Sequence, residues 1–311
     1  MAHILITGGT GLIGKTLTAL LIKNNHTVTV LTRNKATFSN NSSLTYATWH
    51  VDSKQIDIEA IKRADYIVHL AGAGVADQRW SKARKQEIID SRIDSSELLV
   101  HALRKYPNQV KAVISSSAIG WYGADTPDSQ INGFTETAPA DDAFLGDTCR
   151  AWESSISPVK DLGKRLVILR TGIVLSKLGG AYAEFVKPIK AGMAAILGNG
   201  NQVISWIHID DICRMFLYAI EHTSMHGVYN AVAPNPVTNK VLTLSIAKKM
   251  KGRFFLPVHM PSFVLKLVMG EMSVEVLKSA TVSSKKIEAA GFSFSYPTID
   301  SALGALESNA D

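Results

Sequence analysis

The sequence predicts an α/β protein with a doubly wound parallel sheet and a smaller C-terminal lobe. Short apolar runs alternate with segments of helical periodicity through the first 175 residues. A glycine-rich turn joins the first apolar run directly to the first helical segment. After about residue 176 the pattern changes to shorter elements separated by glycine and proline. Alternation of this kind is typical of parallel βαβ units, whose strands are buried on both faces.

The expected elements follow in chain order. Strands are predicted at 3–7, 27–31, 66–71, 112–118 and 165–172, and helices at 14–24 and 78–106. Right-handed crossovers between such strands build a doubly wound sheet of the Rossmann type. The polar stretch 122–147 is predicted to be a loop, and the segment PSFVLKLVMGEMSVEVLKSA to be helical. We therefore expect a nucleotide-binding domain over 1–175 that also takes in parts of 203–233, and a lobe over 176–311 whose last domain spans about 257–306.

Composition limits the protein class. The chain has 311 residues, 46% of them apolar and 19% charged, so it can bury a full core. Its two cysteines, Cys149 and Cys213, lack metal-ligand spacing, which predicts neither a disulfide nor a metal site and favours the cytoplasm. We expect no signal peptide and no membrane segment. The net charge of +6 is scattered and no recognition motif accompanies it, so nucleic-acid binding is not expected.

The glycine-rich turn lies in HILITGGTGLIGKTLTALL. Glycines at this point permit a tight turn and close backbone approach, and the free N–H groups of the helix that follows can bind a pyrophosphate. A plain strand-to-helix turn is the alternative, but its place between a strand and a helix favours dinucleotide binding. The residues expected to contact the cofactor here are Gly8, Thr10, Gly11, Leu12, Ile13 and Gly14.

The end of the second strand predicts which dinucleotide binds. A free ribose 2′-hydroxyl usually meets an Asp or Glu here, whereas this chain has Thr32 and Arg33. A guanidinium forms charge-assisted, bidentate hydrogen bonds with phosphate, and no carboxylate is present to repel it. NADP is therefore predicted in preference to NAD, the alternative being an ordinary exposed arginine at a strand end.

Several unusual strings extend this pattern along nearly the whole chain. They include TGGTGLIG, VHLAGAGV, SSSAIGWYG, LRTGIVLSKLGG, SWIHIDD and YNAVAPNPVTN. On these motifs the chain resembles the extended short-chain dehydrogenases/reductases. Within them it resembles the NAD(P)-dependent epimerase-like proteins that carry a small C-terminal domain. The resemblance implies a Rossmann domain followed by a substrate lobe.

The resemblance also implies further cofactor contacts. Small residues at the end of the third predicted strand let the ribose and pyrophosphate pass close to the backbone. Arg92 occupies a position where relatives usually have Asn, and a solvated helix face is the alternative for it and for Glu87. Val174 would offer its backbone to the nicotinamide, or be only a buried strand residue. These further contacts are Leu70, Ala71, Gly72, Glu87, Arg92 and Val174.

The stretch TCRAWES departs from the family pattern. Active relatives use a Tyr and a Lys four residues apart on a helix, and Cys149 and Glu153 stand in their places. In the usual pair the ammonium lowers the pKa of the phenol, an interaction of roughly 3 kcal/mol at about 5.5 Å and an effective dielectric constant of about 20. A glutamate reverses the sign, so Glu153 disfavours a Cys149 thiolate.

Three interpretations of this pair stay open. In one, Glu153 forms a helix ion pair with Arg150 or supports the site structurally, and Cys149 packs as a small apolar residue. In another, Glu153 acts alone as a general acid or base. In the third, the two residues form a catalytic dyad. Nearby, Ser117 could orient a substrate carbonyl, and Tyr122 could exchange a proton in place of the missing tyrosine, or only pack.

Three other stretches contain weaker candidates. Asp210 or Asp211 is predicted to cap the following helix, with catalysis by His208 the lesser expectation. By resemblance, Gln202 and Trp206 adjoin the substrate cleft and could contact a ligand. The alternative is that they only pack in the loop and the lobe. A group of aromatic and basic residues could receive an anion, or form a solvated helix start. This group is Trp80, Lys82, Arg84 and Lys85.

Two functions remain. The first is an NADP-dependent reductase or epimerase acting on a small carbonyl compound or nucleotide-linked sugar, with a homodimer possible. The second is a redox sensor that binds NADP(H) with little turnover. The missing Tyr and Lys favour the sensor, whereas the glycine turn, Ser117 and the substrate lobe favour the enzyme. Similar folds host many chemistries, so the fold does not decide between them.

Overall fold

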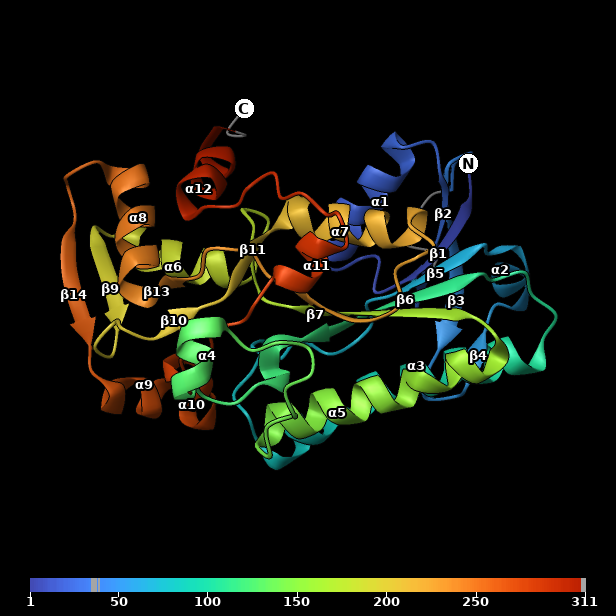
Figure 1. Cartoon of the computed structure of the whole chain (residues 1–311), viewed down its shortest axis with the longest axis horizontal. Coiled ribbons are helices and arrows are strands. Elements are labelled where there is room, and N and C mark those ends of the chain that lie inside the picture. The colour runs from blue at the N-terminus through green and yellow to red at the C-terminus, as the bar shows by residue number, and fades with distance from the viewer. Residues whose placement is uncertain (35–37, 39, 309–311) are drawn as a thin grey trace.

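An eight-stranded sheet with helices on both faces forms the centre of the protein (Figure 1). The computed structural model describes residues 1–34, 38 and 40–308. The sheet order is β12-β7-β6-β5-β1-β2-β3-β4, and only the β3–β4 pair is antiparallel. The strands are β1 His3–Thr7, β2 Thr27–Thr32, β3 Leu44–His50, β4 Gln55–Ile56, β5 Tyr66–His69, β6 Ala112–Ala118, β7 Arg165–Thr171 and β12 Gly227–Ala231. The predicted doubly wound parallel sheet is confirmed.

Helices cover the two faces of this sheet and bury separate apolar clusters. On one face lie α1 (Leu12–Lys23) and α7 (Ile209–Glu221), which pack on Ile4, Ile6 and other sheet residues. On the other face lie α2 (Ile58–Arg63), α3 (Lys82–Lys105), α5 (Phe144–Ile156) and η3 (Ser157–Leu162). Successive residues of β1 point to opposite faces, so Leu5 belongs to the second cluster. This two-sided burial explains the continuous apolar runs in the sequence.

The second lobe contains three short two-stranded sheets and five helices (Figure 1, left). Its apolar centre includes Tyr182, Trp206, Leu242 and Leu303. The strand pairs are β9 Met193–Leu197 with β14 Leu256–Met260, β8 Ile173–Leu175 with β11 Trp206–His208, and β10 Val203–Ile204 with β13 Val237–Thr238. The helices are α6 Ala181–Lys190, α8 Asn239–Lys251, α9 Ser262–Met269, α10 Ser273–Leu277 and α12 Ile299–Ser308.

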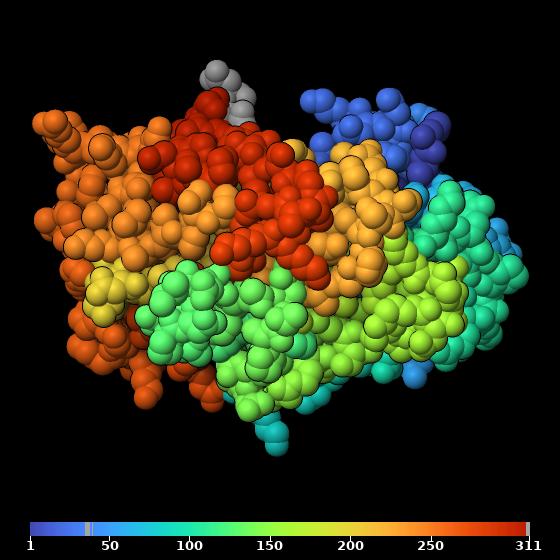
Figure 2. Space-filling model, viewed as in Figure 1, coloured from blue at the N-terminus to red at the C-terminus, as the bar shows by residue number. Residues whose placement is uncertain are grey.

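The C-terminal segment ties the lobe to the main sheet. Helix α11 (Lys285–Ala289) packs against β12, and the chain then crosses α7, as the red segment in Figure 2 shows. The buried carboxylate of Asp211 on α7 accepts hydrogen bonds from the backbone N–H groups of Ser295 and Tyr296, both at 2.9 Å. The predicted boundary near residue 175 stays a prediction.

Two expectations about local structure need correction in part. The stretch 122–147 is not all loop, because it contains α4 (Pro127–Asn132), which begins with a capping box between Thr126 and Ser129. The helical segment after Pro261 is broken into α9, η4 (Gly270–Met272) and α10, because Gly270 adopts φ +63° and ends α9. Among the helices that the structure describes, none combines the length and apolarity needed to span a membrane.

Candidate cofactor and active site

The glycine turn lies where the strand order reverses, between β1 and β5. Gly8 has φ +68°, and a Cβ on it would lie 2.8 Å from the carbonyl carbon of Leu70, beyond β5. A Cβ on Gly14 would lie 2.4 Å from the Gly8 carbonyl oxygen. Only glycine fits at these two positions, because each puts backbone where a side chain would have to be. This is the point at which open α/β sheets bind ligands.

The N-terminus of α1 faces this turn without a side-chain cap. Gly11 is its N-cap and makes no side-chain hydrogen bond, so the first N–H groups of the helix are left for a ligand. Thr10 and Gly11 are exposed, and Leu12 and Ile13 are half-buried. The residues here fit an anionic pyrophosphate.

Leu70 and Ala71, which follow β5, are held against the end of β1 by hydrogen bonds to Thr7. The Thr7 hydroxyl oxygen accepts hydrogen bonds from the N–H groups of Leu70 (3.1 Å) and Ala71 (3.2 Å). It also bonds Nδ1 of His69 at 2.8 Å. Burial lowers the pKa of His69 to about 3, so the ring is neutral at pH 7. Leu70–Gly72 lie just beyond β5 rather than in it.

On the neighbouring strand, β2 ends at Thr32 and Arg33 follows it as an exposed residue. The Thr32 hydroxyl accepts a hydrogen bond from the N–H of Asn34. Because β2 pairs with β1 in parallel, Arg33 and the glycine turn lie at the same edge of the sheet. Val174 lies in β8, half-buried, and its carbonyl oxygen faces Gly180.

The two candidates on α3 have different environments. Glu87 is exposed and pairs with Arg84 at 2.7 Å. Arg92 is buried, and its Nη1 donates to the carbonyl oxygens of Ala73 (3.0 Å) and Ile88 (2.8 Å). Arg92 thus lies directly beside the chain that leaves β5.

Cys149 and Glu153 are both buried on α5, as the spacing predicts. Glu153 does not pair with Arg150, so that half of the interpretation is wrong. Arg150 instead turns outward to Asp142 and Asp147. Glu153 forms an ion pair with Arg170 of β7, a partner that the sequence interpretation did not identify.

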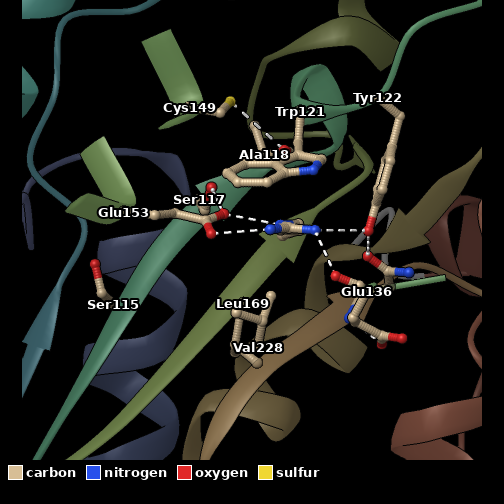
Figure 3. Close-up of polar contacts among 12 residues, drawn as sticks. Ser115, Ser117, Ala118, Trp121, Tyr122, Glu136, Cys149, Glu153, Leu169 and Val228 are labelled. Atoms are coloured by element: carbon tan, nitrogen blue, oxygen red, sulfur yellow. Dashed lines mark hydrogen bonds and ion pairs between the residues drawn. The ribbon is translucent and has the colours of Figure 1, made fainter. Parts of the chain in front are cut away.

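The Glu153 carboxylate has three hydrogen bonds from two side chains (Figure 3). Arg170 donates from Nε to Oε1 at 2.8 Å and from Nη2 to Oε2 at 2.9 Å, and Ser117 donates to Oε1 at 2.7 Å. The Arg170 guanidinium also stacks 3.6 Å from the centre of the Trp121 ring. Ser117, only 1% exposed, therefore joins β6 to α5 through Glu153.

Tyr122 lies on the far side of Arg170 and is fully buried. Its hydroxyl accepts a hydrogen bond from Arg170 Nη1 (3.1 Å) and donates to Oδ1 of Asn230 (2.6 Å). Burial raises its pKa to about 12. These contacts support packing rather than proton exchange.

The Cys149 thiol is also poorly suited to act as a nucleophile. Its Sγ lies 3.6 Å from the Ala118 carbonyl oxygen. Burial, and next the negative charge of Glu153, raise the pKa of Cys149 to about 11. The thiol is therefore neutral at pH 7, as the sign of the Glu153 charge predicts.

Several weaker expectations are corrected by burial and hydrogen bonding. Helix α7 is capped by His208, whose Nδ1 accepts from the Asp210 N–H, and not by Asp210 or Asp211. Trp206 is fully buried and donates to the Asn235 carbonyl, so it packs in the lobe. Gln202 is buried and bonds the Leu197 and Val276 carbonyls instead of facing a ligand.

The group at the start of α3 is largely occupied by internal contacts. Arg84 is buried against Glu87 and the Gly74 carbonyl. Lys85 forms an ion pair with Glu271, and Trp80 packs edge-on against Phe144. Lys82 is exposed. No cluster of three metal-ligating side chains occurs within residues 1–34, 38 and 40–308.

Two surface hollows lie away from these residues. One of about 520 Å³ is lined by the segment 123–142, and one of about 680 Å³ by α9, η4 and α10. Neither is lined by a residue of the predicted site.

Comparison with known proteins agrees with the fold. Residues 4–231 match the model of the NAD dependent epimerase/dehydratase family, and residues 260–306 match a domain of unknown function. The epimerase family protein YfhF of Bacillus subtilis is 34% identical over 98% of this chain and 97% of its own. The epimerase family protein ML0860 of Mycobacterium leprae is 34% identical over 97% of this chain and 94% of its own length.

Two solved structures are also similar. The human epimerase family protein SDR39U1, described with NADPH, has a TM-score of 0.85 and 28% identity, covering 99% of both chains. A nucleoside-diphosphate sugar epimerase from Corynebacterium glutamicum has a TM-score of 0.76 and 30% identity over 97% of this chain and 57% of its own. With its glycine turn at the reversal of strand order, this chain belongs to the NAD-dependent epimerase/dehydratase family, within the extended short-chain dehydrogenases/reductases.

Proposed function

We propose that this protein is an NADP(H)-dependent oxidoreductase or epimerase that acts on a small carbonyl compound or a nucleotide-linked sugar. The observation that carries the proposal is the glycine turn, in which Gly8 and Gly14 leave room only for backbone at the reversal of strand order. The uncapped N-terminus of α1 beside it suits a pyrophosphate. The C. glutamicum relative, named as a nucleoside-diphosphate sugar epimerase, supports the nucleotide-linked substrate.

NADP is proposed over NAD because Arg33 is exposed where a 2′-phosphate would lie, with no acidic residue at the end of β2. The human relative described with NADPH supports this preference. When bound, the cofactor supplies or accepts the hydride. The cofactor is held by the glycine turn, by Arg33, by the segment that follows β5 and by Val174.

For the reacting end of the crevice, we propose that Ser117 and Glu153 form the polar centre. Ser117 reaches Glu153, and Arg170 compensates the charge of Glu153. Cys149 then packs as a small apolar residue beside them. We further expect a cytoplasmic protein, for which a homodimer is one possible state.

A second candidate function is an NADP(H)-binding redox sensor with little turnover. The raised pKa values of Cys149 and Tyr122 favour it, because both groups hold their protons at pH 7. Under this proposal, a partner reads whether the bound cofactor is oxidised or reduced.

A substrate panel distinguishes the two functions. Small carbonyl compounds are added to the NADPH-loaded protein and nucleotide-linked sugars to the NADP⁺-loaded protein, and the absorbance of the reduced nicotinamide and the identity of the product are followed. The enzyme proposal predicts turnover of at least one class, reduced at least tenfold in Ser117→Ala. A panel without turnover, together with proteolysis patterns that differ between NADPH and NADP⁺, would instead favour the sensor.

A further inference from the structure

The net charge of the chain is concentrated in one stretch of the C-terminal lobe. No aspartate or glutamate occurs between Glu221 and Glu271, and the six Lys and Arg residues in this stretch account for the whole net charge of +6. The rest of the chain has as many acidic as basic residues. The expectation that the charge is scattered is therefore corrected.

Four of these cations lie at the end of α8 and in the loop that follows it. Lys248, Lys249 and Lys251 belong to the last turn of α8, and Arg253 comes two residues later. Within the residues that the structure describes, none of the four forms an ion pair. The helix dipole favours lysines in a last turn, but it leaves most of their charge uncompensated.

A tight turn places an aromatic ring among these cations. Gly252 adopts φ +62° and ψ −108°, and the Phe254 N–H donates to the Lys251 carbonyl oxygen at 3.0 Å. These angles are those of a type II′ turn, which favours glycine at its first central position. Phe254 is 88% exposed, and the helix dipole gives no reason for an exposed phenyl ring here.

Two further exposed apolar side chains lie beside this turn. Leu256 begins β14 and is aligned with Met193 of β9, and their exposed fractions are 64% and 46%. The Leu256 N–H donates to the Gly192 carbonyl oxygen at 2.8 Å, two residues after the exposed Lys190. The turn between α8 and β14 lies at the outer end of the lobe, opposite β2–β4 (Figure 1), where orange atoms project at the upper left of Figure 2.

The charge selects among partners for residues 248–256, which we name the basic segment. Two copies of the chain meeting at this segment across a twofold axis would bring like charges together, which disfavours a dimer. An acidic partner fits the cations, and a partner that also offers hydrocarbon fits Phe254 and Leu256. The surface of an anionic bilayer has both properties, since clusters of about four to eight basic residues bind its headgroups and aromatic rings enter its interface.

We propose that the basic segment binds the surface of an anionic lipid bilayer. Its four cations contact the acidic headgroups, and Phe254 inserts at the boundary between headgroups and acyl chains. The contact is peripheral, because none of the described helices is long and apolar enough to cross a membrane. This inference does not depend on the proposed enzymatic function.

The test measures co-sedimentation of the full-length protein with sucrose-loaded vesicles. The vesicles contain phosphatidylcholine alone, or phosphatidylcholine with about 30% phosphatidylglycerol. One variant combines Lys248→Gln with Lys249→Gln, and a second is Phe254→Ser. Thermal unfolding verifies that each variant is folded.

Two matched controls change similar residues elsewhere. Arg104→Gln with Lys105→Gln removes two exposed cations from the last turn of α3. Ile131→Ser removes an apolar side chain of α4 that is 84% exposed. Both controls keep the basic segment intact.

We expect the parent to bind the mixed vesicles and not phosphatidylcholine alone, with an affinity that falls as salt rises from about 0.1 to 0.5 M. The double lysine variant should bind the mixed vesicles at least tenfold more weakly. Phe254→Ser should weaken binding at least threefold, because it removes the inserted ring. Both controls should bind like the parent.

The inference is overturned if the parent binds mixed vesicles no better than phosphatidylcholine, or if either basic-segment variant binds like the parent. Equal losses in the controls would also contradict it. Tighter binding of a short duplex DNA or single-stranded RNA than of the mixed vesicles would assign the segment to nucleic acid instead. Neither NADPH binding nor turnover enters the measurement, so its failure leaves the proposed function standing.

Discussion

Arg170 on β7 binds both carboxylate oxygens of Glu153 on α5, at 2.8 and 2.9 Å. The two residues are 17 positions apart and both are buried. Their contact joins α5 to β7. The buried charge of Glu153 is therefore compensated by a buried cation.

Removing one member of this pair should cost more than removing both. Arg170→Met leaves a buried carboxylate unpaired and should lower the free energy of unfolding by about 3 to 5 kcal/mol. The double variant Glu153→Leu with Arg170→Met should recover at least half of that loss, because no charge is left buried. Urea denaturation of the parent, both single variants and the double variant measures this. Additive losses would show that the two side chains are not coupled.

The network around Glu153 shows where sequence reasoning stops. The glycine turn could be predicted because strand, turn and helix follow one another in the chain, and local geometry fixes the glycines. The partner of Glu153 could not be predicted from helix spacing, which indicated Arg150. A signal was present nonetheless: Arg170 directly follows the buried apolar run Leu166–Leu169 within the strand RLVILRT.

Burial of the lobe residues was harder to foresee. Trp206 and Gln202 follow a glycine-rich loop that resembles a ligand-binding segment, yet both fill space between elements distant in sequence. Likewise, His208 caps α7 because its ring nitrogen accepts a hydrogen bond from the Asp210 N–H. The carboxylate of Asp211 instead accepts a hydrogen bond from the Ser295 N–H in the C-terminal segment. Such choices depend on tertiary contacts that local patterns do not contain.

The Cys149 thiol should resist alkylation. With a pKa of about 11, roughly one thiol in a thousand is ionised at pH 8, and the group is also buried. In a Cys213→Ser background, iodoacetamide should label native Cys149 at least 100-fold more slowly than the denatured protein. Glu153→Gln should speed labelling, because it removes a charge that raises the thiol pKa. Native labelling as fast as denatured labelling would contradict this account of the site.

His69 should make the protein lose stability in acid. Its pKa falls from 6.5 in the unfolded chain to about 3 in the native state, so the unfolded state binds the extra proton. Its contribution is complete above pH 6.5 and is lost, at about 1.4 kcal/mol per pH unit, as the pH falls toward 3. His69→Gln should flatten the stability curve over this window in urea titrations at several pH values. An equally steep curve for the variant would count against this assignment.

Gly14 should tolerate no side chain. A Cβ there would lie 2.4 Å from the Gly8 carbonyl oxygen, so Gly14→Ala must displace the turn and should weaken NADPH binding at least tenfold. Gly304→Ala is the control, because nothing lies within 4 Å of its Cβ position in α12. That variant should bind NADPH like the parent and be up to about 1 kcal/mol more stable. Fluorescence titration and thermal unfolding compare the two variants.

The most direct test of the central claim is the affinity for NADPH and NADH, measured by fluorescence titration in the parent and in Arg33→Met. The account predicts that the parent binds NADPH more tightly than NADH. Arg33→Met should weaken NADPH about 10- to 100-fold, the value of a charge-assisted pair, and leave NADH within about threefold. Tighter binding of NADH by the parent, or an equal loss for both cofactors in Arg33→Met, would contradict it.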